Sequence, residues 1–324
     1  MIFLREKAIG ILNALGTQKE PFLFFTDFEG SKAFVSAVSD LKTTPVFFQI
    51  DDNHHLPEIE TARLTTFNKS PISFEDFQMK YDSVIDHIRK GDSFLTNLAC
   101  KTPIDTNLSL KDIFSLSKAP YKLLFDDSFV VFSPEKFIEI KDDYIYSHPM
   151  KGTIDGRLNN ARDMILNDPK ETAEHVTIVD LIRNDLSQVA NEVTVEKFRY
   201  ITEIQTNEKQ LLQVSSEIRG VLNSNWNEQI GNILFKLLPA GSISGAPKPK
   251  TVDIIKKVEG FDREYFTGVF GIFDGSNFIS AVMIRFIEKK DNQLYFKSGV
   301  GVTSRSDAHK EYQEMIDKIY VPIY

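Results

Sequence analysis

The sequence contains a single cysteine, Cys100, among 324 residues. One thiol excludes a disulfide framework and a cysteine-rich zinc site, and it is typical of a protein that works in the reducing cytoplasm. Long apolar segments are missing too, because every uncharged apolar stretch falls short of the roughly 20 residues that a membrane-spanning helix needs. We therefore expect a cytoplasmic protein that does not cross a membrane.

Basic charge is not in excess either. The chain has 38 Lys and Arg against 46 Asp and Glu, a net charge of −8, which argues against nucleic-acid binding. It also lacks the HExxH, CxxC, G-x-S-x-G and dinucleotide-binding G-x-G-x-x-G motifs. With 42% hydrophobic residues the chain is long enough to bury a core without metal or disulfides. These features together predict a globular protein outside the commonest motif-defined enzyme classes.

Apolar runs bounded by turn residues predict strands, and apolar residues at helical spacing predict helices. The expected strands are 21–26, 45–50, 93–100, 121–132, 136–147, 192–201, 210–221, 269–274, 278–286 and 293–298. The expected helices are 31–42, 73–88, 159–188, 226–237, 250–258 and 307–320. We expect 121–132 and 136–147 to pair as a hairpin. Because helices and strands do not alternate strictly, the predicted class is α+β with extensive antiparallel sheet.

Lys151 lies in the segment Pro149–Thr153, just after a predicted strand. A lysine followed by glycine can approach a ligand closely, and desolvation can lower its pKa enough to give a nucleophilic amine. Taken alone, this short segment is more typical of an ordinary surface lysine in a turn.

Two pairs of acids recur at helical spacing. Glu171 and Glu174 lie three residues apart, as do Glu311 and Glu314, so each pair shares one face of a predicted helix. Carboxylates from two helices that face each other suit Mg²⁺, which prefers a few carboxylates plus substrate oxygens. A solvated acidic face is the alternative for either pair.

Several segments could bind an anion. Pro239–Lys248 is rich in Gly, Pro and Ser and precedes a predicted helix, and Gly299 and Gly301 lie close together in a later segment. Both expose backbone N–H groups, and a helix start favours negative charge. Arg285, at the end of an apolar strand, offers two parallel donors to a carboxylate. The alternatives are a plain helix-initiating loop and a strand-edge salt bridge.

Six segments in this order resemble the chorismate-utilising enzymes, a family of anthranilate, aminodeoxychorismate, isochorismate and salicylate synthases. They are SPEKF from Ser133, PMKGT from Pro149, EHVTIVDLIRND from Glu174, PAGSISGAPK from Pro239, Gly299-Val-Gly301, and EYQE from Glu311. The resemblance covers about residues 73–324. It implies two antiparallel β-sheets packed face to face, with helices outside and the site between the sheets.

The resemblance is strongest to the aminodeoxychorismate branch of that family, because that branch has Lys at the position of Lys151 whereas anthranilate synthases have Ala. In that branch the lysine is a nucleophile that adds to C2 of chorismate and expels the C4 hydroxyl. Ammonia then adds at C4 and releases the lysine. The resemblance makes Glu135 the general acid that protonates the departing hydroxyl. Leu95 stands where isochorismate and salicylate synthases have a lysine that activates water, so addition of water at C2 is disfavoured.

The resemblance also implies ligands for substrate and metal. Glu171, Glu174, Glu311 and Glu314 would surround Mg²⁺, which bridges to the ring carboxylate of chorismate. The residues that match carboxylate-binding positions of the family are Thr153, Ser242, Arg285, Gly299, Gly301 and Lys318. An acidic protein would thereby keep a basic pocket for a dianion.

We expect a shortened N-terminal portion, residues 1–70, packed on a chorismate-binding catalytic domain, residues 71–324. No glutaminase sequence is evident, so ammonia would come from solution or from a separate glutamine amidotransferase subunit. Two alternatives stay open. One is anthranilate synthase component I, and the other is a chorismate-binding subunit without catalytic activity, although the retention of Glu135 and Lys151 argues against the latter.

Overall fold

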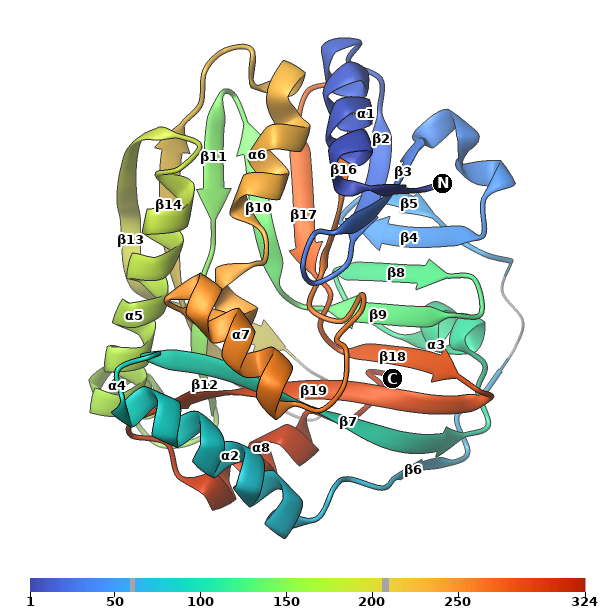
Figure 1. Cartoon of the computed structure of the whole chain (residues 1–324). Coiled ribbons are helices and arrows are strands. Elements are labelled where there is room, and N and C mark those ends of the chain that lie inside the picture. The colour runs from blue at the N-terminus through green and yellow to red at the C-terminus, as the bar shows by residue number, and fades with distance from the viewer. Residues whose placement is uncertain (59–61, 206–209, 324) are drawn as a thin grey trace.

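Two antiparallel β-sheets form the centre of the molecule (Figure 1). The computed structural model describes residues 1–58, 62–205 and 210–323. The first sheet has the spatial order β1 (Ile2–Leu4), β3 (Lys32–Ala37), β2 (Phe22–Thr26), β16 (Val269–Phe273), β17 (Phe278–Val282), β10 (Lys136–Lys141), β11 (Tyr144–Ser147), β14 (Gln210–Val221) and β12 (Met150–Asp155), and β13 (Asn191–Gln205) pairs with β14. The second has the order β15 (Gly245–Ala246), β7 (Leu95–Thr106), β19 (Gln293–Thr303), β18 (Phe286–Lys290), β9 (Phe129–Ser133), β8 (Tyr121–Phe125), β4 (Val46–Ile50) and β5 (Asn53–His55), and β6 (Phe67–Lys69) pairs with β7.

An aromatic core lies between the sheets. Phe25 of the first sheet stacks on Phe34 with ring centroids 4.8 Å apart and meets Phe129 of the second sheet edge-on at 5.8 Å. Large aromatic side chains bury much apolar area each, so a few of them fill the space between two sheets. The expected face-to-face packing of two antiparallel sheets is confirmed.

Helices cover the opposite faces of both sheets. Along β2, Leu23 and Phe25 belong to the core between the sheets, whereas Phe22 and Phe24 pack with helices, so the strand is buried on both sides and is apolar throughout. The helices against the first sheet are α1 (Arg5–Thr17), α5 (Pro169–Leu186) and α6 (Ile230–Leu237). Those against the second are α2 (Phe74–Arg89), α3 (Leu110–Leu116), α7 (Lys248–Val258) and α8 (Ala308–Asp317).

Helix boundaries follow local capping chemistry. Ser73 caps α2, the helix expected over 73–88, by accepting a hydrogen bond from the backbone N–H of Asp76. The expected single helix over 159–188 is instead two, α4 (Ala161–Asn167) and α5, because Asp168 and Pro169 interrupt it. Asp168 accepts from the N–H of Glu171, and this cap starts the helix that carries two of the acids.

Two predictions about the sheets are wrong. Residues 31–42 form β3 and the 3₁₀ helix η1 (Val38–Thr43) rather than a helix, because β3 pairs with strands on both sides. The ranges 121–132 and 136–147 do not pair with each other, since each is a hairpin in its own sheet. Asp142 and Asp143 both adopt positive φ at the tight turn between β10 and β11, which matches the twist of a two-residue hairpin.

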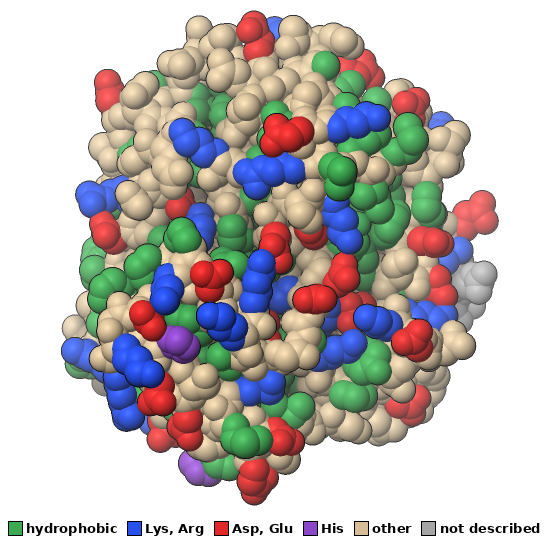
Figure 2. All heavy atoms as spheres, in the orientation of Figure 1, with side chains coloured by type: hydrophobic (Ala, Val, Ile, Leu, Met, Phe, Trp, Pro, Cys, Tyr) green, Lys and Arg blue, Asp and Glu red, His purple; other side chains and the backbone are tan. Residues whose placement is uncertain are grey.

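The first 70 residues contribute to both sheets. Strands β1 to β3 join the first sheet and β4 to β6 join the second. The division of the chain at residue 70 stays a prediction. Across the described ranges, every helix is too short or too polar to pass through a lipid bilayer. On the face shown in Figure 2, acidic and basic side chains are interspersed and form no broad field of one sign.

The buried position of Cys100 gives a test of this fold. The thiol lies on β7 in the core under the helices, is 2% exposed, and has its pKa raised to about 12, chiefly by burial and then by the Glu259 carboxylate. Since only the thiolate is reactive, iodoacetamide at about pH 8 should leave the native protein unmodified. Intact mass after incubation measures this, and the same protein in a denaturing concentration of guanidinium chloride is the control. Rapid alkylation of the native protein would contradict the placement of β7.

Candidate active site

One cavity of about 870 Å³ lies where β7 and β19 of the second sheet meet β12 of the first sheet and helices α5 and α8. All the site residues expected from the sequence line it. They are Glu135, Lys151, Thr153, Glu171, Glu174, Ser242, Arg285, Gly299, Gly301, Glu311, Glu314 and Lys318. These residues come from separate strands, helices and loops, so the fold assembles them from distant parts of the chain. Their chemical roles stay predictions.

Lys151 enters the cavity from an irregular strand. The pairing of β12 with β14 shifts between Met150 and Thr153, and Gly152 has a φ of +88°, which a residue with a side chain rarely adopts. A Cβ on Gly152 would lie 2.8 Å from the Glu171 carboxylate, so glycine also allows α5 to approach. On the opposite side of the cavity, a Cβ on Gly301 would lie 2.9 Å from Lys151 Nζ. Glycine at 152 leaves room for Glu171, and glycine at 301 leaves room for the Lys151 amine over β19.

The Lys151 ammonium is paired within the cavity. Its Nζ lies 2.9 Å from Glu174 Oε2. Burial works to lower the pKa of Lys151, but the carboxylates of Glu174, Glu314 and Glu171 outweigh it, and the pKa is raised. The expectation that desolvation lowers this pKa is therefore wrong for this arrangement. The amine must pass its proton to another group before it can act as a nucleophile.

The four glutamates form an acidic wall from two helices. Glu174 and Glu311 are 4% and 2% exposed, and carboxylates buried this deeply require cations or hydrogen-bond donors. Hard oxygen donors of this kind are what Mg²⁺ prefers, so the donor set fits that ion chemically. In the part of the chain that the structure describes, however, no three His, Cys, Asp or Glu side chains converge closely enough to form a ready-made metal site. The cation that three of these acids surround here is the Lys151 ammonium.

Glu135 lies on the two-residue connection between β9 and β10 and accepts a hydrogen bond from the Ser242 hydroxyl. Burial raises the pKa of this carboxyl against the opposing effects of Ser242, Lys318, Lys151 and Arg285. A raised pKa favours the protonated form that a general acid needs near neutral pH. Ser242 thus contacts the candidate acid in this structure.

Two further cations, Lys318 and Arg285, line the cavity. Lys318 Nζ donates to the Gly299 carbonyl at 2.8 Å and lies 2.8 Å from Glu314, and burial lowers its pKa despite that pairing. Arg285 has a φ of +54°, which is uncommon for a residue with a side chain, and its Nη1 donates to the Lys318 carbonyl at 3.3 Å. Its Nε is buried and donates to no acceptor in the described residues. A guanidinium held this way has a donor to spare for an anion.

The sequence analysis did not identify three further residues of this region. His175 is fully buried, its Nε2 lies 2.7 Å from Ser216 Oγ, and burial followed by the Arg199 charge lowers its pKa to about 4. His175 directly follows Glu174 in the same motif, and that position in the sequence indicates that it lies near the site. Asn97 and Tyr320 also line the cavity, but no local pattern distinguishes them.

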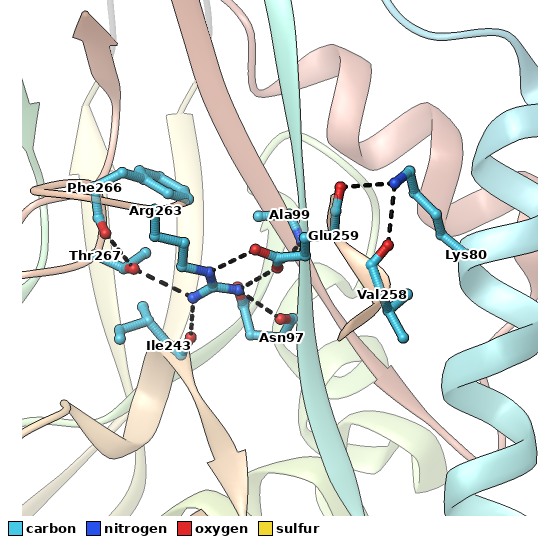
Figure 3. Close-up of polar contacts among 9 residues, drawn as sticks. All are labelled: Lys80, Asn97, Ala99, Ile243, Val258, Glu259, Arg263, Phe266 and Thr267. Atoms are coloured by element: carbon cyan, nitrogen blue, oxygen red, sulfur yellow. Dashed lines mark hydrogen bonds and ion pairs between the residues drawn. The ribbon is translucent and has the colours of Figure 1, made fainter. Parts of the chain in front are cut away.

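A buried ion pair supports the cavity from behind (Figure 3). Arg263 and Glu259 meet at 2.6 Å with side chains 2% and 0% exposed. The guanidinium also donates to the carbonyl of Ile243, next to Ser242, and to the carbonyl of Asn97. Glu259 in turn accepts from the N–H of Ala99 on β7. The pair therefore fixes the Ser242 loop and β7 relative to each other.

Comparison with known proteins gives one family. Residues 17–323 match the family described as chorismate binding enzyme. An uncharacterised PabA-like protein of Haemophilus influenzae is 47% identical over 96% of this chain and 95% of its own length. Anthranilate synthase component 1 of Haloarcula marismortui is 32% identical over 81% of this chain and 55% of its own, and aminodeoxychorismate synthase component 1 of Klebsiella aerogenes is 27% identical over 81% and 60%. The menaquinone-specific isochorismate synthase of Escherichia coli shares the fold, with a TM-score of 0.77 at 16% identity over 98% of this chain and 82% of that one.

The Arg263–Glu259 pair leads to a stability prediction. Arg263→Met leaves a buried carboxylate and two backbone carbonyls without their donor, so we expect the free energy of unfolding to fall by about 3–5 kcal/mol. Denaturant titration measures it. Lys256→Met is the matched control, because it breaks an exposed pair with Glu29 at 2.7 Å and should cost less than about 0.5 kcal/mol. If Arg263→Met were as stable as the control, the pair would not hold these segments together.

Proposed function

The chain belongs to the family of chorismate-binding enzymes, and we propose that it is an aminodeoxychorismate synthase component I. Such an enzyme converts chorismate and ammonia to 4-amino-4-deoxychorismate and water, a step toward 4-aminobenzoate and folate. The observation that carries the proposal is the position of Lys151. Its amine extends into the cavity between Glu174 and Gly301, where a substrate ring could meet it.

The reaction divides into two substitutions. After its ammonium releases a proton, the Lys151 amine forms a bond to C2 of chorismate, both conjugated ring double bonds shift, and the bond from C4 to its hydroxyl breaks. Glu135 supplies the proton with which that hydroxyl leaves as water, which a carboxyl of raised pKa can do. Ammonia then bonds to C4, both double bonds shift back, the neutral amine of Lys151 leaves, and the new ammonium group returns a proton to Glu135. Splitting one difficult substitution into two is the usual advantage of covalent catalysis.

Chorismate carries two carboxylates, and the cavity offers separate cations for them. Arg285 and Lys318 lie together at one wall, where the Lys318 ammonium also touches the Gly299 carbonyl. Thr153 adds a hydroxyl donor from β12, and Ser242 lies in the loop before α7 where its hydroxyl contacts Glu135. Water addition is disfavoured as an alternative, because Leu95 at the floor of the cavity cannot act as a base.

We further propose that Mg²⁺ binds with chorismate, held by Glu171, Glu174, Glu311 and Glu314. The support is the chemistry of the donor set, four carboxylates on two helices that line one cavity. When bound, the ion would supply positive charge to a carboxylate of the substrate. Without it, a dianion would have to approach a wall that holds four acids.

The ammonia would come from solution or from a glutamine amidotransferase partner. The chain itself has a single thiol, Cys100, and that thiol is buried with a strongly raised pKa, so it is no candidate for attack on glutamine.

Product identification tests the reaction. The protein with chorismate, ammonia and Mg²⁺, coupled to the lyase that yields 4-aminobenzoate, should form that product. Lys151→Ala should lose the activity by about a thousandfold or more while its affinity for chorismate changes only a few fold. Lys256→Ala, an exposed lysine on α7, is the control and should keep full activity. Anthranilate or isochorismate as product would reject the proposal, and equal loss of binding and turnover in Lys151→Ala would reject the covalent role.

Calorimetric titration tests the metal independently of turnover. Chorismate should bind the wild type more tightly with Mg²⁺ present, and Glu311→Gln should reduce that gain by about tenfold or more. Glu228→Gln, an exposed acid on the 3₁₀ helix η2 (Trp226–Gln229), should leave it unchanged. Equal chorismate affinity of the wild type with and without Mg²⁺ would rule the ion out as a ligand of this site.

A further inference from the structure

The segment that follows α8 forms part of the cavity wall. Tyr320 and Pro322 line the cavity together with Lys118 and Pro120 from the loop before β8. The segment is held there by backbone contacts, since the N–H of Lys118 donates to the Pro322 carbonyl at 2.9 Å and Ser117 forms an isolated β-bridge with Ile323. Tyr320 therefore has a fixed backbone at the mouth of the site.

The ring of Tyr320 lies under the guanidinium of Arg285, with 5.2 Å between the Arg285 Cζ and the ring centroid. The Nη1 of this guanidinium also donates to the Lys318 carbonyl over a long distance of 3.3 Å. An aromatic face attracts a guanidinium that lies over it and so limits the directions in which its N–H groups can point. The ring of Tyr320 is therefore in a position to influence how Arg285 presents its donors.

The orientation of that plane matters because a carboxylate binds arginine through two parallel N–H groups. A guanidinium that tilts freely either forms only one of the two hydrogen bonds or loses conformational entropy when it forms both. We propose that Tyr320 is a positioning residue for substrate binding, holding the Arg285 guanidinium in the plane that receives a carboxylate of the ligand. This inference rests on the proposed function for the identity of that ligand as chorismate.

Tyr320 contributes little to the core. The residue is 43% exposed, so a smaller side chain there removes a contact at the cavity without opening a void inside the protein. The substitution can therefore be read as a change at the site, and equal melting temperatures of the variants will verify that.

Calorimetric binding of chorismate in the presence of Mg²⁺ tests the inference. Tyr320→Ala should weaken binding by about five- to tenfold and leave the rate at saturating chorismate within about twofold, whereas Tyr320→Phe keeps the ring and should bind within about twofold of the wild type. Tyr144→Ala is the matched control. Tyr144 lies on β11 outside the cavity, and its ring centroid is 4.7 Å from the Arg219 Cζ in a similar cation–π contact. Removing that contact should not change chorismate binding.

A double-mutant cycle with Arg285→Ala separates positioning from direct contact. If the ring acts through the guanidinium, Tyr320→Ala should cause no further loss in the Arg285→Ala background. Additive losses, or equal losses in Tyr320→Ala and Tyr320→Phe, would overturn the inference. So would chorismate binding by Tyr320→Ala at wild-type affinity, although the proposed function would then stand. No chorismate binding by the wild type would reject the proposed function and this inference together.

Discussion

The arrangement of the cavity depends on one buried ion pair, Lys151 with Glu174. The two side chains come from different layers, β12 and α5, and meet at 2.9 Å with the carboxylate almost fully buried. Such a pair is costly to desolvate and stable only when its surroundings fix it closely. The surroundings here are the cap at Asp168 that starts α5, the irregular strand at Gly152, and the bare backbone of Gly301 over which the lysine passes. Together these features fix the position of the Lys151 amine in the cavity.

Acids and cations are interspersed within the site. The acids of α5 and α8 line the cavity together with Lys151, Lys318 and Arg285, and the two lysines pair with Glu174 and Glu314. In a protein of net charge −8, these three cations offset the acids of a cavity that would otherwise repel an anionic ligand. The buried pair of Arg263 and Glu259 stabilises the same cavity without lining it.

The fold class and the residues of the cavity could be predicted because six segments resemble one family, and the fold brings those segments together around one cavity. Prediction failed where structure depends on distant partners. Residues 31–42 have helical spacing of apolar residues, yet strands on both sides hold them as β3. The sign of the Lys151 pKa shift could not be predicted either, since it depends on three carboxylates from two helices. Arg263 and Tyr320 gave no local signal, because their importance comes only from what they touch.

The connection between β9 and β10 consists of Pro134 and Glu135 alone, and it carries the chain from the second sheet to the first. Pro134 restricts the backbone of this two-residue connection, so the connection has little conformational freedom. Any sliding of one sheet past the other would therefore be transmitted directly to the carboxyl group of Glu135. Evolutionary insertions should be tolerated at the hairpin tips near Asp127 and Asp142, which face solvent, and should be excluded from this two-residue bridge.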